Sequence, residues 1–408
     1  MGVYRAERRG NDHGVIAGTD LTGGGLTGTV TLNVDTTQVP QLATANSFAA
    51  TQTVNGNLAL TGSGNGVQFP DGTLQTTAAT GGGGIPSGFM ILGSSPTAPP
   101  GYTLSGTNIT GNVSSPASSV PGTRAGLAAV TVSGKVHAIG GTKLSLNSHE
   151  VYDPSVDSWT KATPMLTLRS GLAAAVDATT GKIYAIGGYN GTTVVGTVEE
   201  YDPSTKHWTS KSPMPTARSG LAVAVDTTSG KIYAIGGIDG NASFLKTVEA
   251  YTPSTDSWST RAPMQTARSG LAATFVNGKI YAIGGSNGQK VLNTVEMYHP
   301  SGNYWSSALP INLARFGLAG CVLNGKIYAI GGSTSILGHP VVNTVEVYDP
   351  TANLWSKAPS PLVARTSLAV TAVTGFIYVI GGSNSARVPL STVEQYSPPV
   401  ILYTFTKN

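Results

Sequence analysis

The stretch "ARSGLAVAVDTTSGKIYAIGG", residues 217–237, contains the pattern that decides the fold. Its small apolar run at residues 220–225 predicts a strand for a crowded, buried position, and residues 231–235 alternate like a hairpin partner. The intervening "DTTSG" supplies the turn. Residues 247–251 alternate again, and "TPST" predicts a turn before a last strand around Trp258. This unit is therefore predicted to be an antiparallel meander of four strands.

The same unit recurs along the C-terminal part of the chain. Gly-Gly doublets mark it, and their first residues are separated by 47, 49, 48, 47 and 50 residues: Gly140, Gly187, Gly236, Gly284, Gly331 and Gly381. One such sheet cannot bury both faces alone, whereas sheets arranged in a ring cover one another. The fold class predicted for residues 121–408 is therefore all-β, a six-bladed propeller. Large rings are expected to fill the wedges between blades, among them Trp159, Trp208, Trp258, Trp305 and Trp355.

These units resemble the Kelch-repeat family, whose hallmark is a Gly-Gly doublet followed by a spaced tyrosine and tryptophan. The resemblance rests on six "IGG" triplets, the five tryptophans and an "E-x-Y" motif in each unit, which begins at Glu150, Glu199, Glu249, Glu296, Glu346 and Glu394. The sixth unit departs from the pattern because it has no tryptophan. Residues 400–405 alternate as its outer strand would, and the segment before Arg124 is the other possible source of that strand.

An arginine precedes the first strand of every unit: Arg124, Arg169, Arg218, Arg268, Arg315 and Arg365. One interpretation places six guanidinium groups around one opening, where they bind carboxylate or phosphate groups of a ligand. The resemblance favours it, because arginines at this position belong to the ligand-binding face of Kelch propellers that bind acidic peptides. The other interpretation is structural, with the arginines capping carbonyls at the blade ends or stacking on neighbouring rings.

The loops after the Gly-Gly doublets vary while the strands around them hardly change. They read "YNGTTVVG", "IDGNASFLK", "SNGQKVL", "STSILGHPVV" and "SNSARVPL". Variation on a rigid scaffold is typical of recognition surfaces. The candidate ligand-binding residues within these loops are Tyr189, Asp239, Phe244, His339 and Arg387. Tolerated drift in exposed turns is the alternative.

Composition excludes several classes of function. Hydrophobic residues make up 40% of the 408 residues and charged residues only 11%, which indicates a folded chain with a neutral surface. The 24 basic residues form no continuous runs, so no nucleic-acid partner is expected. No signal peptide and no membrane span are expected either, because no long apolar run occurs.

Enzymatic members of the resembled family offer a test. A copper radical oxidase needs a cysteine cross-linked to a tyrosine and a pair of histidine ligands, but Cys321 lies in the apolar run "GLAGCV" and the six histidines are scattered. No metal and no cofactor are therefore expected. "GGGLTG" at residues 23–28 has dinucleotide-binding spacing, but a strand follows it rather than a helix. A sugar mutarotase or epimerase, which uses ordinary acidic and basic groups around the channel, stays open as the alternative function.

The N-terminal part has another character: residues 1–84 are predicted to be a stalk, and residues 85–120 a collar-like segment and linker. Short alternating runs such as "GTVTLNVD" cannot form a core alone, which favours a homotrimeric stalk over a disordered linker. Residues 17–57 and 66–79 resemble tail-fibre-like proteins of phages and bacteria, and "IPSGFMILGSSPTAPPGYTLSG" is similar to the start of a tail-collar domain. The resemblance implies an extracellular or particle-surface fibre, a non-enzymatic adhesin whose propeller binds a glycan or protein partner, with avidity from several copies.

Overall fold

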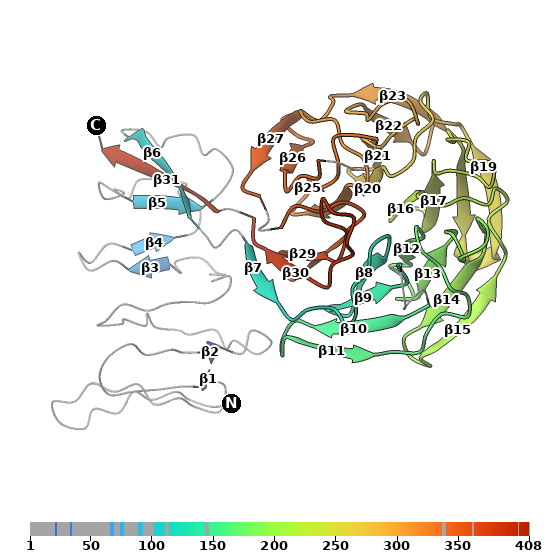
Figure 1. Cartoon of the computed structure of the whole chain (residues 1–408). Coiled ribbons are helices and arrows are strands. Elements are labelled where there is room, and N and C mark those ends of the chain that lie inside the picture. The colour runs from blue at the N-terminus through green and yellow to red at the C-terminus, as the bar shows by residue number, and fades with distance from the viewer. Residues whose placement is uncertain are drawn as a thin grey trace. The chain divides into compact units, whose positions relative to one another are not determined.

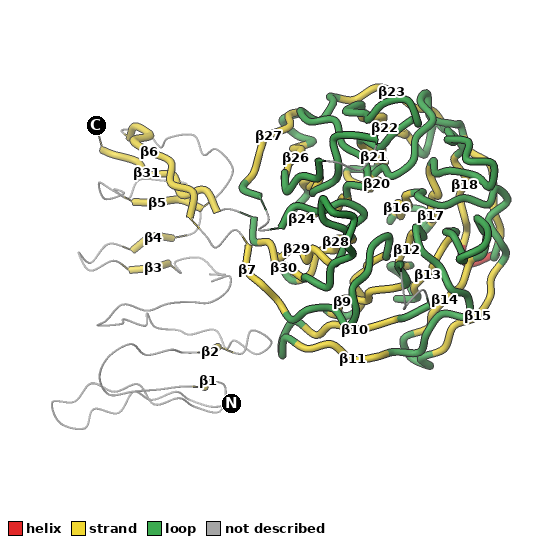
Figure 2. Tube along the Cα trace, in the orientation of Figure 1, coloured by secondary structure: helices red, strands yellow, loops and turns green. Residues whose placement is uncertain are grey.

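A computed structural model describes residues 114–142, 147–336, 340–360 and 363–398, and beyond them only the backbone of short strands. The chain divides into two units, Ile109–Val400 and a smaller one made of Met1–Asn108 with Ile401–Asn408. Figure 2 shows that the larger unit consists of strands and loops arranged in a ring.

The larger unit contains six antiparallel sheets of four strands, here called blades one to six, which confirms the predicted propeller. Blade one comprises β8 (Ala128–Val132), β9 (Lys135–Ile139), β10 (His149–Asp153) and β11 (Ser158–Lys161). Blade two comprises β12 (Ala173–Val176), β13 (Ile183–Ile186), β14 (Val198–Asp202) and β15 (His207–Lys211). Blade three comprises β16 (Ala222–Asp226), β17 (Lys231–Ile235), β18 (Val248–Thr252) and β19 (Ser257–Arg261), with the 3-10 turn η1 (Pro253–Thr255) between the last two.

The remaining blades repeat this order. Blade four comprises β20 (Ala272–Val276), β21 (Lys279–Ile283), β22 (Val295–His299) and β23 (Tyr304–Ala308). Blade five comprises β24 (Ala319–Leu323), β25 (Lys326–Ile330), β26 (Val345–Asp349) and β27 (Leu354–Ala358). Blade six comprises β28 (Ala369–Val373), β29 (Phe376–Ile380), β30 (Val393–Tyr396) and β7 (Ser114–Ala117).

Blade six is completed from the N-terminal side. Strand β7 pairs antiparallel with β30, with Ala117 opposite Val393, so the ring closes between segments far apart in sequence (Figure 1). The expectation that residues 400–405 form this outer strand is wrong: they belong to β31 (Val400–Lys407), which pairs with β5 (Phe89–Leu92) in the smaller unit. The segment before Arg124, the other source considered, supplies the strand instead.

The joint at the closure between blades six and one matches four of the other joints. In blade three the indole Nε1 of Trp258 donates to the carbonyl of Ser212 at 2.9 Å, just past the last strand of blade two. In blade one Trp159 donates in the same way to Ser118 at 2.7 Å, just past β7. The joint between blades five and six is the exception, because β7 carries no tryptophan that could donate to the end of blade five.

Close backbone approach explains the Gly-Gly doublets. Gly140 has φ +65°, and a Cβ there would lie 2.6 Å from the carbonyl oxygen of Arg169 in the next blade. The N–H of the following Gly141 donates to that same carbonyl at 3.0 Å. The equivalent bonds run from blade to blade until Gly382 donates to Arg124 at 2.9 Å, which closes a ring of backbone hydrogen bonds.

A second ring of backbone bonds lies at the axis. Each member's N–H donates to the carbonyl of the preceding one, and the members are Gly126, Gly171, Gly220, Gly270, Gly317 and Ser367. The first strands behind this ring line a central channel of about 220 Å³ with small and apolar side chains. The large apolar side chains of the other strands fill the wedges between blades, as the core around Tyr233, Tyr298 and Trp305 illustrates.

The smaller unit contains short strand pairs. β1 (Leu21–Thr22) pairs with β2 (Asn33–Val34), and β3 (Gly66–Gln68) pairs with β4 (Leu74–Thr76). A third sheet has the order β5, β31 and β6 (Tyr102–Thr110). Most of the predicted stalk and collar-like segment lies outside the described residues.

Candidate functional site

The six arginines that precede the first strands are buried, each with an exposed fraction of 0%. In blade three the Nη2 of Arg218 pairs with Glu249 at 2.7 Å, and its Nη1 donates to the carbonyls of Gly236 and Thr247 at 3.0 and 2.7 Å. The glutamate belongs to the "E-x-Y" motif on the third strand. Every blade has such a pair, called here the arginine–glutamate pair: Arg124–Glu150, Arg169–Glu199, Arg218–Glu249, Arg268–Glu296, Arg315–Glu346 and Arg365–Glu394.

The pairs hold the chain as it passes from one blade to the next. The carboxylate of Glu199 accepts the backbone N–H groups of Leu166 and Thr167 at 2.8 and 3.0 Å, in the segment just before Arg169. Burial lowers the pKa of the Arg169 guanidinium, and the charge of Glu199 opposes that shift. Because the pKa of a free guanidinium lies far above neutral pH, Arg169 stays charged at neutral pH in spite of this shift.

The interpretation of these arginines as an open ring that binds a ligand is therefore corrected. Their donors point to carbonyls and carboxylates inside the blades, and none of the six side chains is accessible to solvent. The alternative interpretation, in which they cap carbonyls at the blade ends, describes what this structure contains.

The face that carries the variable loops is a rigid one. In blades two to six the loop after the Gly-Gly doublet is tied by isolated β-bridges, for example Tyr189 to both Ser170 and Val194, and Ile238 to both Ser219 and Phe244. The first partner of each loop is the residue that follows a buried arginine. We call this surface, formed by these loops and the connections between blades, the Gly-Gly face.

The candidate residues on this face have different roles. Tyr189 is exposed, and its hydroxyl donates to the carbonyl of Gly191 at 3.0 Å. Asp239 accepts the N–H groups of Asn241 and Ser243 at 2.9 Å each, so its carboxylate shapes its own loop.

The other three candidate residues are Phe244, Arg387 and His339. Phe244 is half-buried in blade three and packs against the next blade, where a Cβ on Gly288 would lie 2.6 Å from its ring. Arg387 is exposed in its loop. His339 lies outside the described residues.

Exposed apolar side chains gather on the Gly-Gly face. Nine large apolar side chains are exposed among the described residues. Six of the nine lie in its loops or inter-blade connections: Leu166, Leu168, Tyr189, Leu309, Ile336 and Val388. The others, Val156, Tyr304 and Leu354, lie at the turns between third and fourth strands on the opposite face.

The central channel contrasts with this face in chemistry. The described residues that line it are glycine, alanine, leucine, valine and serine, so its walls carry no ionisable side chain there. The thiol of Cys321 lies buried in β24, and burial raises its pKa to about 12, which leaves it unreactive at neutral pH.

The described part of the chain contains neither a metal-binding cluster nor a membrane-spanning helix. It holds no group of three histidine, cysteine, aspartate or glutamate side chains arranged to bind a metal ion. None of the helices among the described residues is long and apolar enough to cross a membrane.

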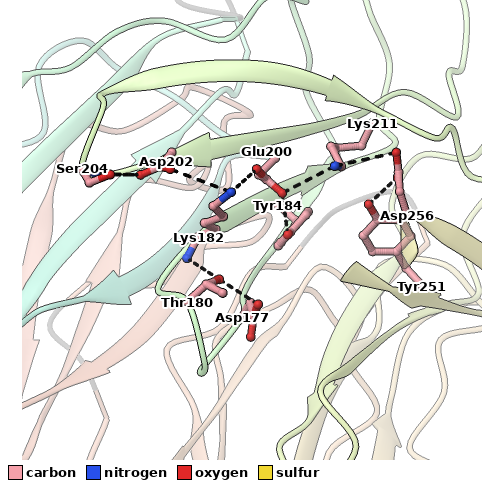
Figure 3. Close-up of polar contacts among 10 residues, drawn as sticks. All are labelled: Asp177, Thr180, Lys182, Tyr184, Glu200, Asp202, Ser204, Lys211, Tyr251 and Asp256. Atoms are coloured by element: carbon pink, nitrogen blue, oxygen red, sulfur yellow. Dashed lines mark hydrogen bonds and ion pairs between the residues drawn. The ribbon is translucent and has the colours of Figure 1, made fainter. Parts of the chain in front are cut away.

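A polar network that sequence reasoning missed lies between blades two and three (Figure 3). Glu200 accepts the Lys182 ammonium at 2.8 Å and the Tyr184 hydroxyl at 2.6 Å. Lys211 lies 3.9 Å from the Glu200 carboxylate and 3.7 Å from that of Asp256, so it links the two blades. Burial pushes the pKa of Glu200 up, but the bonds from Lys182 and Tyr184 outweigh burial and leave this pKa below its usual value.

Through Lys211 the network connects Glu200 of blade two with Asp256 of blade three. Its sequence signal was a glutamate in "VEEY" where the other repeats have Val151, Ala250, Met297, Val347 and Gln395.

Blade one contains a buried histidine pair. The Nδ1 of His137 and the Nε2 of His149 are 2.8 Å apart, in positions that blade two gives to Tyr184 and Val198. Burial lowers the pKa of His137 to about 4, with the charge of Lys135 adding to the shift. Burial also lowers the pKa of His149 to about 3, and the neighbouring His137 contributes.

Next to this pair is the second described cavity, with a volume of about 410 Å³. We call it the blade-one pocket, and its walls are Pro121, Gly122, Asn147, Ser148, His149, Glu150, Lys161, Ala162 and Pro164. The sequence did not predict this pocket, because residues 121–122 and 147–164 come together only in the folded blade.

The ring of blades, the Gly-Gly joints and the arginine–glutamate pairs together define a β-propeller of the Kelch type. Residues 176–382 match the family described as the KLHDC2/KLHL20/DRC7 Kelch-repeats domain, and residues 123–166 match the Kelch motif. The chain belongs to the Kelch-repeat family.

A solved structure titled "Structure of YjhT" resembles the chain in fold. The likeness has a TM-score of 0.59 at 16% sequence identity, and it covers 67% of this chain and 95% of that one. At this level of identity, it supports the propeller fold and says nothing about activity.

Proposed function

We propose that this protein is a non-enzymatic binding protein that recognises a glycan or a protein partner through the Gly-Gly face. The observation that carries the proposal is the concentration of exposed apolar side chains there, including Tyr189, Ile336 and Val388 on variable loops. Exposed apolar groups on a rigid, variable surface are typical of an interaction site. Preformed loops also keep the entropy cost of binding small.

The partner need not be anionic. The preference for an acidic ligand depended on six accessible guanidinium groups, and those groups are buried in the arginine–glutamate pairs. A mutarotase or epimerase activity is the alternative, but it calls for acidic and basic groups around the channel, and the described channel walls do not support it.

We also propose that residues 1–84 oligomerise as a stalk, displaying several propellers on an extracellular or particle surface. The support is the resemblance of residues 17–57 and 66–79 to tail-fibre-like proteins. Several weak contacts would then combine through avidity. Sedimentation of the full-length chain tests this part: a trimer is expected, and a strictly monomeric protein contradicts it.

An array of glycans and peptides probed with the full-length chain tests the recognition proposal. The double variant Tyr189→Ala/Val388→Ala removes two exposed apolar side chains from the Gly-Gly face and is expected to weaken the strongest signal by about 10-fold or more. Val156→Ala/Leu354→Ala is the matched control, because it removes similar exposed groups from the opposite face. Equal binding by both variants would refute the assignment of this face.

A further inference from the structure

Blade one departs from the arrangement of the arginine–glutamate pair in the other blades. In blade two the glutamate accepts two backbone N–H groups from the residues three and two places before the arginine. In blade one these places are occupied by Pro121 and Gly122. Proline has no N–H, so Glu150 cannot receive the first of these bonds.

Blade three shows that the proline alone can be compensated. It also has a proline, Pro215, three places before Arg218, but the hydroxyl of Thr216 donates to Glu249 at 2.8 Å and fills the gap. Blade one has a glycine at that place, which has no side chain to do so. The departure is therefore specific to blade one.

Buried polar groups around this pair therefore lack hydrogen-bond partners. Arg124 pairs with Glu150 at 2.7 Å and donates through Nη2 to the carbonyl of Pro121 at 2.7 Å. The Nε and Nη1 of Arg124 and the Oγ of Ser148 are buried without a hydrogen-bond partner. Leaving such groups unsatisfied costs about 1–3 kcal/mol each, so their retention calls for an explanation.

One of these unsatisfied groups, the hydroxyl of Ser148, belongs to a residue in the wall of the blade-one pocket. Glu150, which is only 5% exposed, also lines the cavity, and so does Lys161, its cross-strand partner on β11. The volume of about 410 Å³ is within the range of pockets that hold small molecules. Pro121, Ala162 and Pro164 supply apolar wall between the polar groups.

The pocket wall contains both a negative and a positive side chain, which disfavours a charged ligand. An anionic ligand would meet the carboxylate of Glu150, and a cationic ligand would meet Lys161 with Arg124 behind Glu150. A hydroxyl group donates and accepts at once, so it can donate to Glu150 while it accepts from Lys161 or Ser148. The C–H surface of a sugar ring also suits the proline and alanine wall.

We propose that the blade-one pocket binds a neutral polyhydroxyl molecule the size of a monosaccharide. The pocket is built from the loop and the connections of blade one on the Gly-Gly face, but it shares no residue with the exposed apolar side chains and loop candidates named above. Tyr189→Ala/Val388→Ala leaves the pocket wall unchanged and Ser148→Ala leaves those two side chains unchanged, so the variants separate the two proposals and either can fail alone.

The test titrates the full-length protein with glucose, galactose, glucuronate and glucosamine, followed by ligand-observed NMR. At least one of the two neutral sugars is expected to bind, with a dissociation constant of about 1 mM or tighter, while the charged analogues bind more weakly. Ser148→Ala is expected to weaken binding by about 2- to 10-fold, since one neutral hydrogen bond is lost. Ala162→Leu is expected to abolish binding by filling the pocket.

Thr197→Val is the matched control, because Thr197 in blade two occupies the position of Ser148 and does not line the blade-one pocket. It is expected to leave sugar binding unchanged. Thermal unfolding of each variant separates lost binding from lost structure. The proposal is overturned if no neutral sugar binds, if a charged analogue binds best, or if folded Ser148→Ala and Ala162→Leu proteins bind like the wild type.

Discussion

At the scale of single residues, the arginine–glutamate pairs are expected to govern stability. Arg218→Ala leaves the carboxylate of Glu249 buried without its counterion, and breaking a buried pair in this way typically costs about 3–5 kcal/mol. We expect urea denaturation to show a fall of that size in the free energy of unfolding. Lys246→Ala, at an exposed position, is the control and should change it by about 0.5 kcal/mol or less. A small effect at Arg218 would contradict the bracing role.

The histidine pair predicts sensitivity to acid. The pKa of His137 is lowered to about 4 and that of His149 to about 3, so the folded state stays unprotonated where an unfolded chain binds protons, below about pH 6.5. Stability is therefore complete above about pH 6.5 and is lost as the pH falls towards about 4, by about 2 kcal/mol between about pH 6 and about pH 5. The charges of Lys135 and Arg124 nearby act in the same direction.

The double variant His137→Tyr/His149→Val installs the residues of blade two and should remove most of this acid sensitivity. Urea denaturation at about pH 7 and about pH 5 measures it. If wild type and variant lose the same stability in acid, the histidine pair is not the cause.

Sequence reasoning at this scale identified the repeated arginines and glutamates but not their partnership. Residues such as Arg218 and Glu249 lie 31 positions apart, and only the meander places them 2.7 Å from each other. The blade-one pocket had a local signal, the replacement of "MQTAR" by "VPGTR" before the arginine, but its meaning required knowing that the missing N–H faces Glu150.

At the scale of elements, β7 is the strand on which closure of the ring depends. A chain that begins at residue 121 loses β7 and Val120, whose side chain is buried in the core between blades six and one. Burial of a valine contributes about 1.5–3 kcal/mol, and the lost strand pairing adds to it. We expect the midpoint of thermal unfolding to fall by about 5 °C or more relative to a chain that begins at residue 109. Equal midpoints would show that the ring closes without β7.

The four strands of each blade followed from the sequence, because alternation, turn residues and a fixed period all agree. The closing strand did not, since residues 400–405 alternate as well as a blade strand does. Alternation identifies a strand but not its partner. The choice is made by the joint to the next blade, where Ser118 after β7 meets both Trp159 and Asp157.

At the scale of the whole molecule, the propeller is a scaffold that holds variable loops on one face. Two closed rings of backbone hydrogen bonds and six buried pairs hold the blades together, while the loops after Gly-Gly differ in length and chemistry. The sequence predicted this division of roles because repetition marks the scaffold and variation marks the loops. It could not predict the ligand, since recognition depends on how side chains from separate blades combine.

Hydrogen–deuterium exchange of the full-length protein, with and without its strongest array ligand, shows directly which face of the propeller binds. We expect slower exchange in the bound state at loops of the Gly-Gly face, such as residues 189–195, 238–245 and 383–390. We expect no change at the turns of the opposite face, such as residues 153–158. Protection confined to those opposite turns, or none anywhere in the propeller, would contradict recognition through the Gly-Gly face.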